Sequence, residues 1–70
     1  MAQPVRVNGK IEELELPMSV AALVARTTGS PSRLGYAVAR NGQIVPRSTW
    51  DEVRIEPGDE LEITAPFAGG

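Results

Sequence analysis

The chain contains no cysteine and no histidine. This composition removes thiolate chemistry, disulfides, the usual zinc and iron ligands and the most common general base. Closely spaced carboxylates can act as a general acid and base, and two stretches contain them: Glu12, Glu13 and Glu15, and Glu60 and Glu62. Both stretches are better explained as the solvent-facing residues of strands, which alternate with buried ones. We therefore expect no intrinsic catalytic residue and no metal site.

The last residues offer a different chemistry. Gly69 and Gly70 have no Cβ, so their backbone can enter a slot that excludes side chains. Phe67 and Ala68 complete the stretch that would thread into such a slot, and residues 66–70 can extend by roughly 16 Å. A carboxylate on Gly70 is a poor acyl donor, but adenylation by ATP would make it a good one, and a sulfur nucleophile could then displace AMP. The alternative is that two terminal glycines occur by chance.

Length, charge and hydropathy limit the other classes of function. A chain of 70 residues forms one domain with a thin core, which favours a binding or carrier module over a self-sufficient enzyme. Seven basic and nine acidic residues give a net charge of −2, which argues against nucleic acid as the main partner. No apolar run reaches the roughly 20 residues of a membrane span. The start of the chain has no secretory pattern, and a small domain without disulfides is expected in the cytoplasm.

Alternating apolar residues predict a hairpin at the start of the chain. Asn8-Gly9 is a strong turn signal, because both residue types tolerate positive φ. Antiparallel pairing across this turn places four apolar residues on one face: Val5, Val7, Leu14 and Leu16. Ile11 then points to the other face of the sheet.

A helix is expected over about residues 19–28. Ser19 can cap its first turn, and Gly29 can adopt the left-handed conformation that ends it. Spacings of three and four give one narrow apolar stripe: Val20, Leu23 and Val24. Such a stripe suits a helix that lies across one face of a sheet.

The second half of the chain predicts a further hairpin and a final strand. A two-residue turn at Asn41-Gly42 pairs Val38 with Val45 on the core side and Ala39 with Ile44 on the outer side. Residues 47–53 have no regular pattern, and Trp50 is expected to fold back as a lid on the core. Residues 56–59 fit a turn, and residues 60–65 fit a strand with two inward residues, Leu61 and Ile63.

The expected order is strand, strand, helix, strand, short strand, strand. This order predicts an α+β fold of the β-grasp, or ubiquitin-like, kind. We expect a mixed sheet of four to five strands, with the first and last strands as its central pair and the helix on one face.

The outer face of this sheet is a candidate partner surface. We expect a small apolar patch with a charged rim: Ile11, Ala37, Ala39 and Ile44, flanked by Glu60, Glu62 and Arg6. Scattered apolar residues are also common on any domain surface. Six acidic residues fall in the last twenty positions, which suits either a solvated face or a docking surface for a basic partner.

Several motifs resemble the ThiS sulfur carriers of bacterial thiamin thiazole biosynthesis over nearly the whole chain. The most specific stretch is "VARNGQIVPRSTW" at residues 38–50. The others are "VNG" at 7–9, "ELELPMSVAALV" at 13–24, "PGDELEI" at 57–63 and the terminal Gly69-Gly70. Arg40 departs from the pattern, since an apolar residue would suit its place. "PFAGG" is one of several spellings of the tail in this family.

The resemblance implies a role for Gly70 as the activated residue. An E1-like adenylating enzyme (ThiF) would use Mg-ATP to adenylate its carboxylate. A sulfur donor, typically a cysteine desulfurase persulfide, would convert it to a thiocarboxylate, and thiazole synthase (ThiG) would take the sulfur. Residues 1–65 would form the β-grasp domain and residues 66–70 a flexible tail. This protein would bind no cofactor itself.

Two other kinds of protein share the terminal diglycine. One is a sulfur carrier for another pathway, such as the small subunit of molybdopterin synthase. The other is a ubiquitin-like modifier or a simple interaction module.

Overall fold

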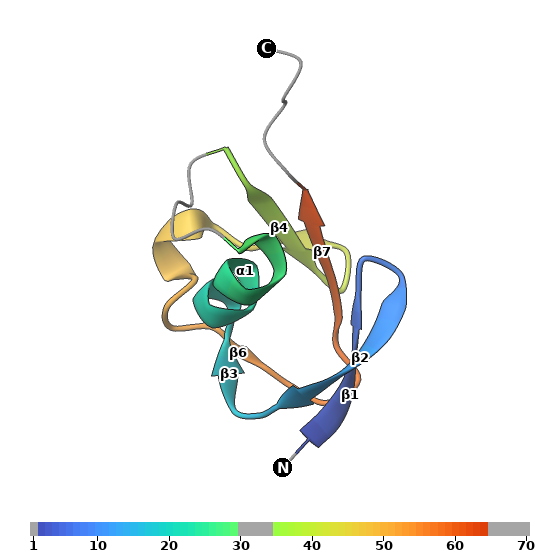
Figure 1. Ribbon diagram of the computed structural model, residues 1–70. Coiled ribbons are helices and arrows are strands. Elements are labelled where there is room, and N and C mark those ends of the chain that lie inside the picture. The colour runs from blue at the N-terminus through green and yellow to red at the C-terminus, as the bar shows by residue number, and fades with distance from the viewer. Residues whose placement is uncertain (1, 30–34, 65–70) are drawn as a thin grey trace.

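The backbone forms two sheets and one α-helix in the computed structural model, which describes residues 2–29 and 35–64 (Figure 1). The larger sheet has the strand order β2-β1-β7-β4-β5, and the smaller pairs β3 with β6. The elements in chain order are β1 Ala2–Val7, β2 Lys10–Glu15, β3 Met18–Ser19, α1 Val20–Thr28, β4 Ala37–Arg40, β5 Gln43–Ile44, the 3-10 helix η1 Arg47–Thr49, β6 Arg54–Ile55 and β7 Glu60–Thr64. The five-stranded mixed sheet with one helix on one face confirms the predicted β-grasp fold.

The first hairpin has the predicted turn and faces. Val7 pairs with Lys10 across Asn8-Gly9, and Asn8 has a φ of 51° while Gly9 has 84°, as a two-residue hairpin turn of the primed type requires. Val5, Val7 and Leu14 are buried, and Leu16 packs against the core. Ile11 faces the opposite side, as predicted, and is 63% exposed.

Helix α1 begins after Ser19, whose hydroxyl oxygen accepts a hydrogen bond of 3.0 Å from the Ala22 N–H. Gly29 ends it at a φ of 69°, and its N–H donates to the carbonyl of Ala25. The predicted stripe is buried against the sheet together with one alanine: Val20, Ala21, Leu23 and Val24. The helix therefore covers one face of the larger sheet, and the other face is left open (Figure 1).

The parallel pair of β1 and β7 lies in the middle of the larger sheet, as predicted. The second hairpin also has the predicted register, with Ala39 opposite Ile44 and the Val45 N–H bonded to the Val38 carbonyl at 2.8 Å. Leu61 and Ile63 of β7 point into the core.

Residues 47–55 are more regular than the sequence predicts. They contain η1 and the short strand β6, which pairs with β3. Trp50 is 1% exposed and its Nε1–H donates to the Val45 carbonyl at 2.9 Å, so it is part of the core rather than a lid over it. Two-residue strands carry no periodic pattern, and for this reason the smaller sheet was not predicted.

Candidate functional site

The predicted reactive tail follows directly after β7. Residues 66–70, with Phe67, Ala68, Gly69 and Gly70, lie outside the described residues, and Thr64 is the last residue of the strand. The end of β7 lies at the opposite end of the body from the start of β1 (Figure 1). The described fold can therefore influence the position of the tail only through β7, the strand that precedes it.

Strand β7 is paired unequally on its two sides. Antiparallel β4 pairs with it from Leu61 to Thr64, whereas parallel β1 pairs only at Glu60 and Leu61. Beyond Leu61, the side chain of Asn8 takes the place of the pairing with β1. Its Oδ1 accepts a hydrogen bond of 2.8 Å from the Ile63 N–H. The N–H of Asn8 also donates to the Leu61 carbonyl at 2.9 Å.

The second Asn-Gly turn holds the start of β7 in the same way. The N–H of Asn41 donates to the Glu60 carbonyl at 2.8 Å, and its Oδ1 accepts from the Glu60 N–H at 2.9 Å. Asn8 and Asn41 both have a φ of 51°. Each asparagine therefore forms a tight turn and also binds β7, one at each end of the strand.

Asp59 joins this second turn to the loop before β7. It is 7% exposed, and its carboxylate accepts hydrogen bonds from Arg40 Nε at 2.8 Å, from the Glu56 N–H at 2.9 Å and from Asn41 Nδ2 at 3.1 Å. These contacts explain Arg40, which looked out of place in the sequence. Sequence reasoning missed Asp59, because its side-chain partners Arg40 and Asn41 lie 19 and 18 residues away in the chain.

The pKa of Asp59 is lowered from its ordinary value of 3.8. Burial raises this pKa, but the hydrogen bonds from Glu56, Asn41 and Arg40 and the charge of Arg40 outweigh burial. A lowered pKa means that the folded state prefers the carboxylate. Asp59 thus stabilises the fold above the pKa of the unfolded chain, and this stabilisation is lost as the pH falls through the folded-state pKa.

We expect Asp59→Asn to lower the free energy of unfolding by about 1–3 kcal/mol at neutral pH, because the charged hydrogen bonds are lost. The difference between the two proteins should shrink as the pH falls from 3.8 towards the lower folded-state pKa, because Asp59 becomes protonated first in the unfolded chain and then in the folded protein. Urea unfolding of both proteins at neutral and acidic pH measures this difference in the free energy of unfolding. A difference that stays constant across this range would contradict the assigned role.

The residues predicted as a partner surface all lie on the open face of the larger sheet. Arg6 lies between Ile11 and Glu60 on neighbouring strands, and Ala39 lies between Glu62 and Ile44. Ala37 follows on β4 opposite Thr64, and Ile44 is 72% exposed.

The layout of this face differs from an apolar patch with a charged rim. Ile11 lies on edge strand β2 and Ile44 on edge strand β5, so four strand spacings, roughly 19 Å, separate their strands. Arg6, Glu60 and Glu62 occupy the central strands between them. The charged residues are therefore in the middle of the face, and the two exposed isoleucines flank them.

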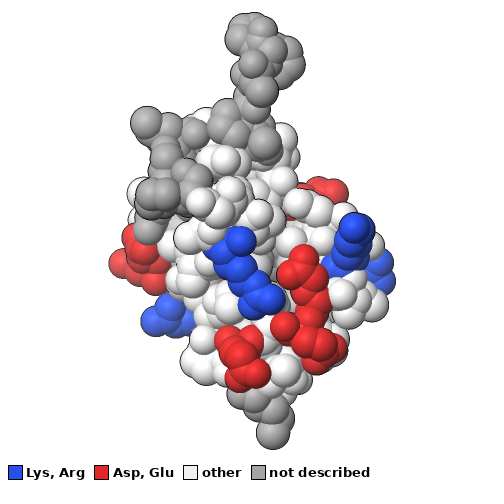
Figure 2. Space-filling model, in the orientation of Figure 1, with Lys and Arg blue, Asp and Glu red and all other residues white. Residues whose placement is uncertain are grey.

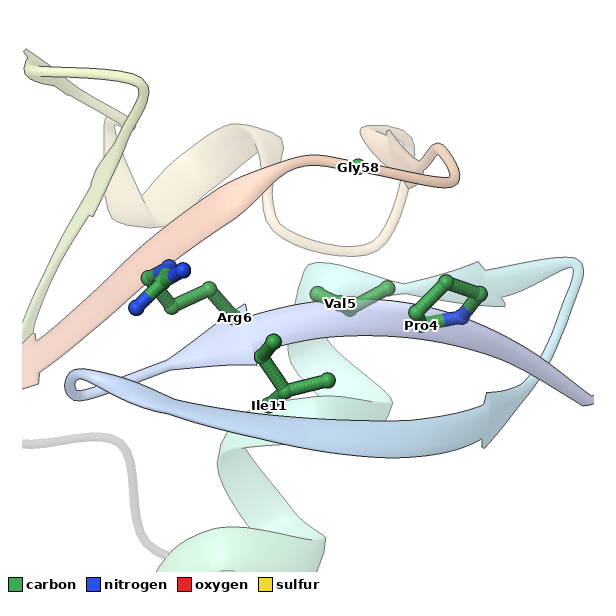
Figure 3. A pocket seen from close by; sticks show the side chains of 5 residues that line it. All are labelled: Pro4, Val5, Arg6, Ile11 and Gly58. Carbon is green, nitrogen blue, oxygen red and sulfur yellow. The ribbon is translucent and has the colours of Figure 1, made fainter.

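A shallow hollow of about 140 Å³ lies at one end of this face, between β1, β2 and the turn before β7. Its lining is Pro4, Val5, Arg6, Ile11 and Gly58 (Figure 3). The Gly58 N–H donates to the Pro4 carbonyl at 3.0 Å, which holds the turn against β1. The hollow lies near the start of β7, so it is remote from the end that bears the tail.

Charges of both signs are interspersed on the face seen in Figure 2. In the described part of the chain, no three histidine, cysteine, aspartate or glutamate residues are grouped as a metal site requires. No helix within residues 2–29 and 35–64 has the length and apolar content needed to cross a membrane.

Comparison with known proteins gives three kinds of similarity. The model of the ThiS family matches residues 2–70. A thiazole synthase of Paramagnetospirillum magneticum is 41% identical over 64 residues, which cover 91% of this chain but 19% of that protein. The chain thus spans about a fifth of the length of this curated relative. The crystal structure of the thiamine biosynthesis protein ThiS of Geobacter metallireducens covers 97% of this chain and 100% of its own, with a TM-score of 0.74 at 21% identity. This last likeness shows the shared fold.

Proposed function

The chain belongs to the ThiS family of small sulfur carriers of thiamin biosynthesis, and we propose that Gly70 is the residue on which it carries sulfur. The family match over residues 2–70 is the observation that carries this proposal, because it includes the diglycine as well as the fold. The described part of the chain supplies strand β7, which ends at Thr64, two positions before the tail begins at residue 66.

The proposed chemistry takes place on the Gly70 carboxylate when it ends the chain. An oxygen of this carboxylate attacks the α-phosphorus of Mg-ATP in a ThiF-like adenylating enzyme, and pyrophosphate leaves. A persulfide sulfur of a donor such as a cysteine desulfurase then attacks the acyl carbon, and AMP leaves with the oxygen. A thiol reduces the acyl disulfide, which leaves one sulfur atom on Gly70 as a thiocarboxylate. The ATP and magnesium belong to the partner enzyme, and the reaction is expected in the cytoplasm.

Thiazole synthase is the proposed acceptor of this sulfur. Support comes from the relative in Paramagnetospirillum magneticum, which is itself a thiazole synthase and contains a segment similar to nearly all of this chain. This protein would therefore be a recycled co-substrate of the acceptor and not a catalyst.

The open face of the larger sheet is the proposed contact with the adenylating enzyme. Its exposed isoleucines can be buried by a partner, and Glu60 and Glu62 between them suit a partner with basic groups opposite. The face includes β7, so a partner that binds there receives the tail at a defined place.

Intact-protein mass spectrometry tests the proposed function. Incubation with the cognate adenylating enzyme, Mg-ATP and a persulfide donor should raise the mass by the difference between one sulfur and one oxygen atom, at Gly70. An unchanged mass with the cognate enzyme would contradict the proposal. Isopeptide bonds to lysines of other proteins would instead indicate a modifier, and a deletion strain whose thiamin requirement is not met by thiazole would indicate another pathway.

A further inference from the structure

We propose that Asn8 is a positioning residue that sets the direction in which the chain leaves β7. The inference rests on the proposed function, since direction matters only if the residues that follow must reach another active site. Asn8 lies near the start of the chain, far in sequence from Gly70. Its side chain nevertheless binds Ile63 of β7, 55 residues further along the chain.

Strand β7 is paired unequally on its two sides near its end. From Glu62 to Thr64, β7 is paired with β4 on one side, whereas its pairing with β1 on the other side ends at Leu61. A strand that is hydrogen-bonded along one side alone can adopt different angles to its neighbour, because the twist between adjacent strands ranges from about −10 to −35°. The bond from Ile63 N–H to Asn8 Oδ1, at 2.8 Å, holds the second side. It acts one residue before the end of the strand.

The turn also holds the backbone of Asn8 against β7. Asn8 lies at a φ of 51°, in a two-residue turn whose other residue is Gly9. Its own N–H binds the Leu61 carbonyl at 2.9 Å, so backbone and side chain together hold β7 at two successive inward residues. Ile63 is buried, and its N–H would lose its partner without the Asn8 side chain.

The fold also provides a matched control. Asn41 has the same φ, the same following glycine and the same use of its side-chain oxygen, but it binds Glu60 at the start of β7. Asn8→Gly and Asn41→Gly both keep a residue that accepts positive φ and remove the side-chain acceptor. Asn41→Gly also removes the hydrogen bond from Asn41 Nδ2 to Asp59, so it is the more severe of the two changes for stability. Only Asn8→Gly removes a contact near the C-terminal end of β7, from which the chain continues into the tail. Asn8→Asp keeps an acceptor and tolerates this φ, so it serves as the rescue.

The test is the rate of pyrophosphate release by the cognate adenylating enzyme as the concentration of the carrier is varied. All variants are compared at a temperature at which circular dichroism shows them folded. We expect Asn8→Gly to lower kcat about ten- to a hundredfold at unchanged KM, because the body still docks but the reactive end is misplaced. Asn41→Gly should keep the parental kcat although it also weakens the fold, and Asn8→Asp should restore most of kcat.

Amide hydrogen exchange in the free protein tests the physical cause. Exchange at Ile63 should become about tenfold faster in Asn8→Gly and recover in Asn8→Asp. Faster exchange with an unchanged kcat would overturn the proposal, because the bond would then be structural alone. A raised KM at unchanged kcat would also overturn it and identify Asn8 as a contact of the partner. A parent protein that releases no pyrophosphate would contradict the proposed function itself, and the positioning role with it.

Discussion

Adding one alanine after Gly70 is expected to abolish activation of the protein while leaving its fold intact. The added residue moves the carboxylate away from the second glycine and places a side chain where the backbone must pass through a narrow slot. Loss of the reactive geometry should lower the rate of adenylation at least about a hundredfold. Pyrophosphate release and intact-protein mass spectrometry measure this loss.

Thermal unfolding of the extended protein should match that of the parent, because the described core ends at Ile63 and β7 at Thr64. The control carries the same alanine after Met1, at the other end of the chain, and should be activated normally. Normal activation of the chain extended beyond Gly70 would contradict the free-carboxylate mechanism.

The second large effect is expected from charge reversal in the middle of the open sheet face. Glu60→Lys combined with Glu62→Lys should raise the KM of the adenylating enzyme for this protein about ten- to a hundredfold, because like charges would oppose the proposed basic partner. The effect should weaken as the salt concentration rises. Steady-state kinetics at two ionic strengths measures both quantities.

The matched control reverses Glu52 and Glu56, two exposed acidic residues outside the larger sheet. It changes the net charge by the same amount, so a specific contact and a general charge effect can be separated. Equal rises in KM in the two double variants would reject the open face as the docking surface. An unchanged KM in the first double variant would reject it as well.

Much of the fold could be predicted because its signals are local. Alternation in β1, β2 and β7 identifies their buried residues, and the spacing of Val20, Leu23 and Val24 identifies the buried side of α1. The two Asn-Gly turns fix both hairpin registers, since their positive φ values depend on two adjacent residues. The small sheet of β3 and β6 could not be predicted, because its strands have two residues each and depend on a distant partner.

By itself, the sequence determined the core-facing pattern, the turns, the lack of histidine and cysteine, and the family to which the chain belongs. Only the tertiary structure decided how β7 is held and how the open face is arranged. It placed charged residues between Ile11 and Ile44, paired Arg40 with Asp59 and brought Asn8 to Ile63. The physical reason is that periodicity and turn preference act between neighbours in the chain. Side-chain hydrogen bonds between segments 19 and 55 residues apart exist only once the strand order has brought them together.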